Sequence, residues 1–198
     1  MNAVSNTTPL RYLTAIRQEH LLAQLFEKVF VPTAVYDELT DPKTPEDVRT
    51  TVVSLPAWLE VRAVRETGAA TFPVTLHRGE REAILLAEAI RADVLLIDEQ
   101  IGRTIAQSRN IPLSGTLGVV ERADSMGLVS DFPQVLKELN TSGFFIAEAL
   151  ELQPCGVTTH AKKRNNRTEN SGERGRARTF DKRIKSPLLN QLSYAPTS

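Results

Sequence analysis

Short apolar runs alternate with amphipathic segments along the first 120 residues, and this alternation constrains the fold more than any other feature of the sequence. Runs with strand character occupy residues 3–5, 29–31, 59–64, 94–97 and 111–113. The fourth run, Val-Leu-Leu-Ile, is apolar throughout, as is typical of a strand covered on both faces. Strands separated by helices favour a parallel sheet with right-handed crossovers, so the sequence predicts an α/β fold.

The segments between these runs show helical signals. Thr8 is predicted to cap a helix that has Pro9 in its first turn, and the apolar pattern beyond it predicts two helices broken near Glu19 and His20. Residues 79–92 form the clearest amphipathic helix. Further helices are predicted at 35–39, 46–53 and 100–108, and another is opened by residues 115–118.

Charge divides the chain into two regions. Residues 1–152 carry 14 basic and 21 acidic residues, while the remainder carries 10 basic and 3 acidic residues. We therefore expect a folded domain at 1–153 and a basic, disordered tail at 154–198. We interpret the tail as an extension without function, and the alternative is a basic arm that contacts nucleic acid.

An acidic domain lacks the positive surface by which many proteins bind nucleic acids. Chemistry on a nucleic acid would then depend on carboxylates and a metal ion. The single cysteine, Cys155, excludes an intramolecular disulfide and zinc sites built from several cysteines. With neither a leader sequence nor a membrane span recognised in the sequence, we expect a cytoplasmic protein without membrane contact.

Oxygen-bearing side chains cluster where a parallel sheet binds its ligands, beyond the carboxyl ends of the strands. Asn6 follows the first predicted strand, and Asp98 and Glu99 follow the fourth. Glu38 and Glu82 border the buried faces of their helices. These five residues are therefore predicted to meet at one end of the sheet.

Several neighbouring carboxylates repel one another unless a cation or protons neutralise them. Mg²⁺ and Mn²⁺ prefer such oxygen ligands, whereas Zn²⁺ favours histidine and cysteine. A metal held in this way can activate water for attack on phosphorus. The pattern thus indicates metal-dependent phosphodiester hydrolysis.

Five segments in a fixed order resemble the motifs of a known family. They are SNTTPL at 5–10, VYDEL at 35–39, GEREAILLA at 79–87, LLIDEQIGR at 95–103 and PLSGTLGVV at 112–120. Over residues 1–152 the chain resembles PIN-domain proteins, in particular an uncharacterised VapC-like branch. The resemblance implies a three-layer fold, in which helices flank a central, mostly parallel sheet of four to five strands.

The resemblance also implies a Mg²⁺- or Mn²⁺-dependent endoribonuclease, often the toxin of a toxin–antitoxin pair. Such a protein acts on RNA, is neutralised by a small antitoxin protein and forms a homodimer. A doubly wound nucleotide-binding domain is the competing class, and the lack of a glycine-rich fingerprint argues against it.

Carried over by position, Glu38 and Glu82 match the second and third acidic residues of PIN nucleases. The fourth falls at Asp98 or Glu99, and the sequence does not decide between them. The Thr7 hydroxyl would help to hold the first ligand. These acidic residues are accordingly the predicted catalytic and metal-binding residues.

Asn6 stands where most PIN nucleases have their first aspartate. An amide oxygen can bind a metal but adds no negative charge, so the affinity for a cation should fall. We favour a site that still works. The alternative is a catalytically weakened PIN-like binding module.

Other residues near these motifs receive simpler interpretations. Glu66, Glu80 and Glu88 are predicted to be solvated surface charges, and Tyr36 and Trp58 are predicted to lie in the core or in an interface.

Two glycines and three arginines lie near the predicted site in the sequence. Gly115 and Gly118 are interpreted as turn and packing residues, with Thr116 supporting the site. Three arginines are candidates for contacts with substrate phosphates, although surface solubility is the commoner explanation for such residues: Arg78, Arg81 and Arg103.

Overall fold

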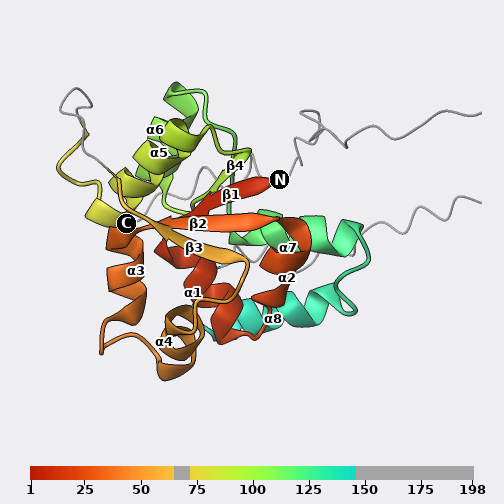
Figure 1. Ribbon diagram of the computed structural model, residues 1–198. Coiled ribbons are helices and arrows are strands. Elements are labelled where there is room, and N and C mark those ends of the chain that lie inside the picture. Colours follow the sequence, from red (N-terminus) through yellow and green to blue (C-terminus); the bar gives the residue numbers. More distant parts are fainter. Residues whose placement is uncertain (65–71, 146–198) are drawn as a thin grey trace, which may run out of the picture. The chain divides into compact units, whose positions relative to one another are not determined.

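A five-stranded parallel sheet forms the centre of the protein. The computed structural model describes residues 1–64 and 72–145 (Figure 1). The strands lie in the order β3-β2-β1-β4-β5, and their bounds are β1 Asn2–Ser5, β2 Lys28–Pro32, β3 Leu59–Arg62, β4 Val94–Leu96 and β5 Leu113–Ser114. All four pairings are parallel, so the predicted α/β class is confirmed.

Helices cover both faces of this sheet and complete a three-layer arrangement. Figure 1 shows α5 and α6 above the sheet, and α1, α4 and α8 below it. The helices are α1 Thr7–Ala15, α2 His20–Leu25, α3 Thr33–Thr40, α4 Glu46–Val53, α5 Arg78–Ile90, α6 Gln100–Ser108, α7 Thr116–Ser125 and α8 Phe132–Thr141. Among the described helices, none has the length and apolarity that a bilayer crossing requires.

The apolar face of α5 packs on the middle of the sheet. Val4 of β1 is in register with Phe30 of β2 and Leu95 of β4, and these residues belong to one buried cluster with Ile84 and Ala87 of α5. Helical spacing places Ala83, Ile84 and Ala87 on one side of α5. This packing fixes the first turn of α5 beside the carboxyl ends of the strands.

The start of α1 differs from the sequence-based expectation. The helix begins at Thr7, and Asn6 occupies the cap position with an extended backbone and no side-chain cap hydrogen bond. Thr8 is not the cap, because its hydroxyl donates to Glu99. The predicted cap was wrong because the Thr8 hydroxyl binds Glu99, a residue distant in sequence, instead of a backbone amide of α1.

Helix α8 was not predicted at all. Its first turn is held by Asp131, whose carboxylate accepts a hydrogen bond from the Gln134 amide at 3.0 Å, and it buries Val135, Leu136 and Leu139. The third strand is shorter than predicted and ends at Arg62. The proposed tail at 154–198 and Glu66 lie outside the described residues.

Candidate active site

The carboxyl ends of β1 and β4 bring Asn6 beside Glu99. Ser5 is in register with Leu96, and the Asn6 amide extends this pairing by donating to the Leu96 carbonyl at 3.0 Å. Because parallel strands end at the same edge, the residues that follow them are held side by side. The expected meeting of the first and fourth motifs therefore occurs.

Asn6 and Glu99 form the centre of the site. Asn6 is 2% exposed, and its Nδ2 donates to Glu99 Oε2 at 2.7 Å. The Thr8 hydroxyl donates to the other carboxylate oxygen, Oε1, at 2.8 Å. Both oxygens of Glu99 are thus held in place by residues at the start of α1.

The side-chain oxygen of Asn6, Oδ1, lacks a hydrogen-bond donor among the described residues. Asn6 Oδ1 is buried and accepts no hydrogen bond from any described residue. A buried acceptor without a partner carries a desolvation cost of about 1–3 kcal/mol. A bound cation or water at this position would remove that cost, so the oxygen is suited to ligate a metal.

Glu38 reaches the same region from α3. The hydroxyl of Thr7, next to Asn6, donates to Glu38 Oε2. The first turn of α5 comes so close that a Cβ on Gly79 would lie 2.9 Å from Glu38 Oε1. The missing side chain at Gly79 therefore leaves room for the Glu38 carboxylate. The Thr7 hydroxyl was expected to hold the first ligand, Asn6, but it donates to Glu38 instead.

Glu80 is an acidic residue of the site that the sequence interpretation missed. It was expected to be solvated, but it is 8% exposed and accepts a hydrogen bond from the His77 amide at 3.0 Å. Burial raises the pKa of Glu80, and the neighbouring Glu99 carboxylate raises it further, against the opposing effect of the His77 amide. The signal available in the sequence was its place in the first turn of α5.

Glu82 points elsewhere. Its Oε2 accepts from the Ala34 amide at 3.1 Å, and its Oε1 accepts from Arg78 Nε at 2.7 Å. Two residues along a helix correspond to a rotation of about 200°, so Glu82 and Glu80 leave α5 in different directions. Glu82 holds the first turn of α3, which is a structural role that the sequence did not predict.

Asp98 also binds a helix start. Its carboxylate accepts from the Thr116 amide at 2.9 Å and from the Thr116 hydroxyl at 2.6 Å. A Cβ on Gly115 would lie 2.4 Å from Asp98 Oδ1, so the predicted packing role of this glycine agrees with the structure. Of the two alternatives for the fourth position, Glu99 contacts Asn6 and Asp98 fixes α7.

Burial raises the pKa of Asp98 to about 6. The two hydrogen bonds from Thr116 oppose this shift, because they favour the charged carboxylate, while the negative charge of Glu99 adds to it. Asp98 therefore takes up a proton more readily than an ordinary aspartate.

The three arginines lie around the site in different settings. Arg103 Nη1 donates to the Ile97 carbonyl at 2.8 Å, and Arg78 pairs with Glu82 while its side chain stays 63% exposed. Arg81 is half-buried on α5. Their contact with substrate phosphates stays a prediction.

The five predicted ligands do not gather around one point. Within residues 1–64 and 72–145, no three acidic, histidine or cysteine side chains lie close enough together to surround a metal ion. Asn6, Glu99 and Glu80 are neighbours and Glu38 joins them through Thr7, whereas Glu82 and Asp98 are occupied by backbone amides. The prediction of a single five-residue cluster is corrected accordingly.

Comparison with known proteins places the chain in a family. No curated protein matches it. A solved structure of a PilT N-terminus domain protein from the hyperthermophilic archaeon Sulfolobus solfataricus P2 is similar, with 16% sequence identity, a TM-score of 0.46, and coverage of 62% of this chain and 93% of that one. A family model described as PIN domain matches residues 2–153. This chain therefore belongs to the PIN-domain family, whose fold is of the nuclease type.

Proposed function

We propose that this protein is a Mg²⁺- or Mn²⁺-dependent endoribonuclease, which hydrolyses RNA phosphodiester bonds at the carboxyl end of its sheet. One observation carries the proposal: the buried Asn6 Oδ1 lacks a hydrogen-bond donor among the described residues and lies on the same side chain that binds Glu99. The nuclease-type fold supports it. We assign Asn6 and Glu99 to the metal, and Glu80 and Glu38 lie beside them.

The donor set fits a hard divalent ion. All of these side chains offer oxygen, which Mg²⁺ and Mn²⁺ prefer. The negative charge of Glu99 contributes to the raised pKa of Glu80, and a divalent cation would relieve this repulsion. The same ion would satisfy Asn6 Oδ1.

The chain itself positions the groups for hydrolysis. A bound Mg²⁺ or Mn²⁺ would supply an activated water and stabilise the leaving oxygen. Thr7 and Thr8 orient the carboxylates of Glu38 and Glu99. Asp98 and Thr116 fix the turn that carries Glu99, and we propose that the exposed Arg78 contacts a phosphate of the RNA.

The VapC-like motifs support a more specific setting. We infer that the protein is the toxin of a toxin–antitoxin pair in the cytoplasm, that a small antitoxin protein blocks it, and that it forms a homodimer. Co-expression with the product of a neighbouring short reading frame should give a stable complex. Light scattering should give the purified toxin the molar mass of a dimer.

RNA cleavage tests the function directly. The purified chain should cut RNA when Mg²⁺ or Mn²⁺ is present, EDTA should stop the reaction, and Glu99→Gln should lower the rate at least tenfold. Glu88→Gln is the matched control, since Glu88 lies on α5 but pairs with Arg109 at the surface. The proposal fails if folded protein, free of any partner, cuts no RNA with either metal.

A catalytically weakened binding module is the second candidate, and Asn6 is the residue that favours it. The amide takes the place of a charged ligand and already donates to Glu99. Asn6→Asp separates the two functions. If the natural chain is a catalytically weakened module, the Asn6→Asp variant should gain RNA cleavage. If it is already an active enzyme, the cleavage rate should change only modestly.

A further inference from the structure

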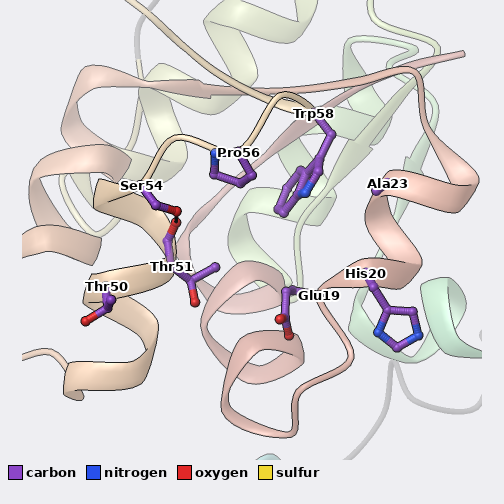
Figure 2. A pocket seen from close by; sticks show the side chains of 8 residues that line it. All are labelled: Glu19, His20, Ala23, Thr50, Thr51, Ser54, Pro56 and Trp58. Carbon is purple, nitrogen blue, oxygen red and sulfur yellow. Dashed lines mark hydrogen bonds between the residues drawn. The ribbon is translucent and has the colours of Figure 1, made fainter.

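An open cavity lies at the other end of the sheet from Asn6 and Glu99. It has a volume of about 380 Å³ and is lined by the start of α2, the end of α4 and the loop that leads into β3 (Figure 2). Trp58, which lines it, directly precedes the first residue of β3. The cavity is therefore beside the amino end of that strand, whereas Asn6 and Glu99 follow carboxyl ends.

A carboxylate oxygen without a hydrogen-bond donor lines this cavity. Glu19 Oε2 is buried and accepts no hydrogen bond from any described residue. A buried carboxylate oxygen is costly to leave unsatisfied. A ligand that brings an N–H donor with positive charge would remove this cost.

An aromatic wall faces the same space. Figure 2 shows the Trp58 indole beside Pro56, with Thr51 on one side and Glu19 across the cavity, where the Glu19 carboxylate lies at the end of its side chain farther from the indole. The face of an indole attracts a cation within about 6 Å of its centre. The cavity thus combines a negative group, a cation-attracting ring and a hydroxyl.

Neither lysine nor arginine is among the residues that line the cavity, and its one imidazole, on His20, points away from the Glu19 carboxylate (Figure 2). The ammonium of Lys28 lies nearby and donates to the Ala57 carbonyl at 2.8 Å. The Glu19 carboxylate and the Trp58 indole could both interact with a cation. That cation would have to come from a bound ligand.

The loop that forms the wall has a strained backbone. Leu55 has a φ of +42°, which is rare for a branched residue and disfavoured again by the proline that follows. Such strain persists only where the surroundings maintain it. Here it holds Pro56 and Trp58 on the cavity.

We propose that this cavity binds an organic cation with a guanidinium or ammonium group, which pairs with Glu19 and stacks on Trp58. The site is independent of the proposed nuclease centre. Its volume fits a small ligand, and the group could belong to a free amine or to a side chain on a peptide. Both sources share one chemistry at Glu19 and Trp58.

Trp58 reports binding directly because it is the chain's only tryptophan. The full chain, kept in EDTA so that no metal takes part, is titrated with agmatine, with N-acetylarginine amide and with the neutral n-butylurea. We expect a saturable change in tryptophan fluorescence with one or both cations and none with the urea. Saturation by agmatine identifies a free amine as the source, and saturation by the arginine amide alone identifies a peptide side chain.

Two variants assign the signal to the cavity. Glu19→Gln should weaken binding about tenfold, because a charge-assisted hydrogen bond is lost, while Glu27→Gln at the exposed end of the loop after α2 should leave it unchanged. Calorimetry with Trp58→Phe should show severalfold weaker binding and keeps the test valid if Glu19→Gln fails to fold. Absence of saturation with both cations, or equal binding by folded Glu19→Gln, would overturn the proposal.

Discussion

At the scale of single residues, Asn6 controls the charge of the candidate site. Its amide serves two purposes at once, since Nδ2 donates to Glu99 while Oδ1 stays without a donor among the described residues. An aspartate at this position would keep the oxygen but replace the donor with a second negative charge. Compared with aspartate, asparagine at this position should therefore lower the affinity for a cation and raise the stability of the metal-free protein.

Asn6→Asp should make this difference measurable. In EDTA, the free energy of unfolding should fall by about 1–3 kcal/mol, because a hydrogen bond to a charged group is replaced by carboxylate repulsion. Mn²⁺ should restore more stability to the variant than to the natural chain. Urea unfolding with and without Mn²⁺ checks this, and equal stabilisation of both proteins by Mn²⁺ would contradict it.

Asp98 should give the stability a distinct pH dependence. Its pKa is about 6 in the folded protein against an ordinary 3.8, so the folded state binds the proton more tightly than the unfolded state. Its contribution is fully present below about pH 4, declines as the pH rises toward 6, and is lost above that.

Asp98→Asn removes this titration and keeps a similar shape. In EDTA, the stability of the variant relative to the natural chain should rise between pH 4 and pH 7, as followed by urea unfolding at each pH. A constant difference across that range would show that Asp98 titrates normally.

Part of the site was predictable from residue positions. Asn6 and Glu99 follow strands that pair in the sheet, so their order in the sequence predicted their proximity. Glu80 was interpreted as a solvated charge but is buried near Glu99, and Glu82, a predicted ligand, accepts hydrogen bonds from Ala34 and Arg78. Helical periodicity shows which residues share a face, but the contacts that turn Glu82 toward Ala34 come from α3, which is distant in sequence.

At the scale of elements, two carboxylates fasten helix starts to the carboxyl edge of the sheet. Glu82 accepts from the first turn of α3, and Asp98 accepts from the first turn of α7. Negative groups at these positions also interact favourably with the helix dipoles. The helices that surround the candidate site thus depend on acidic residues that do not contact Asn6.

Glu82→Ala should destabilise the fold by about 2–3 kcal/mol, because the buried Ala34 amide loses its acceptor and Arg78 loses its partner. Glu88→Ala is the matched control on the same helix, with an exposed ion pair worth at most about 1 kcal/mol. Chemical unfolding of both variants gives the comparison. A loss below that of Glu88→Ala would mean that Glu82 is not a structural residue.

The regular elements were more predictable than their ends. The strand runs and the amphipathic pattern of α5 persist because burial follows the same periodicity in the fold. The start of α1 was misplaced by two residues, because Thr8, the expected cap, binds Glu99 across 91 positions. Helix α8 was missed because its capping residue, Asp131, was not recognised among the surrounding polar residues.

At the scale of the whole molecule, the domain boundary remains a prediction. The family match ends at residue 153, which coincides with the change from an acidic to a basic composition. A chain ending at 153 should keep its unfolding midpoint within about 2 °C and its metal-dependent cleavage rate within a factor of about two, because it retains every buried apolar residue that the structure describes. Calorimetry and an RNA cleavage assay of the shortened chain check this, and loss of folding would place part of the domain beyond 153.

The sequence predicted the parallel pairing of the strands but not their order in the sheet. Alternating strands and helices predicted parallel pairing, because crossover helices enforce it. The order β3-β2-β1-β4-β5 was not predicted, since it depends on which faces the helices cover. That order places β1 in the centre and thereby sets Asn6 next to the end of β4.

The proposed function requires a divalent cation to bind between Asn6 and Glu99. A crystal of the full chain soaked in Mn²⁺, with data collected to give an anomalous difference map, would locate this cation. We expect a manganese peak within coordinating distance of Asn6 Oδ1 and a Glu99 carboxylate oxygen. A peak held by Asp98 or Glu82 away from Asn6, or no peak at the carboxyl end of the sheet in soaked crystals, would contradict it.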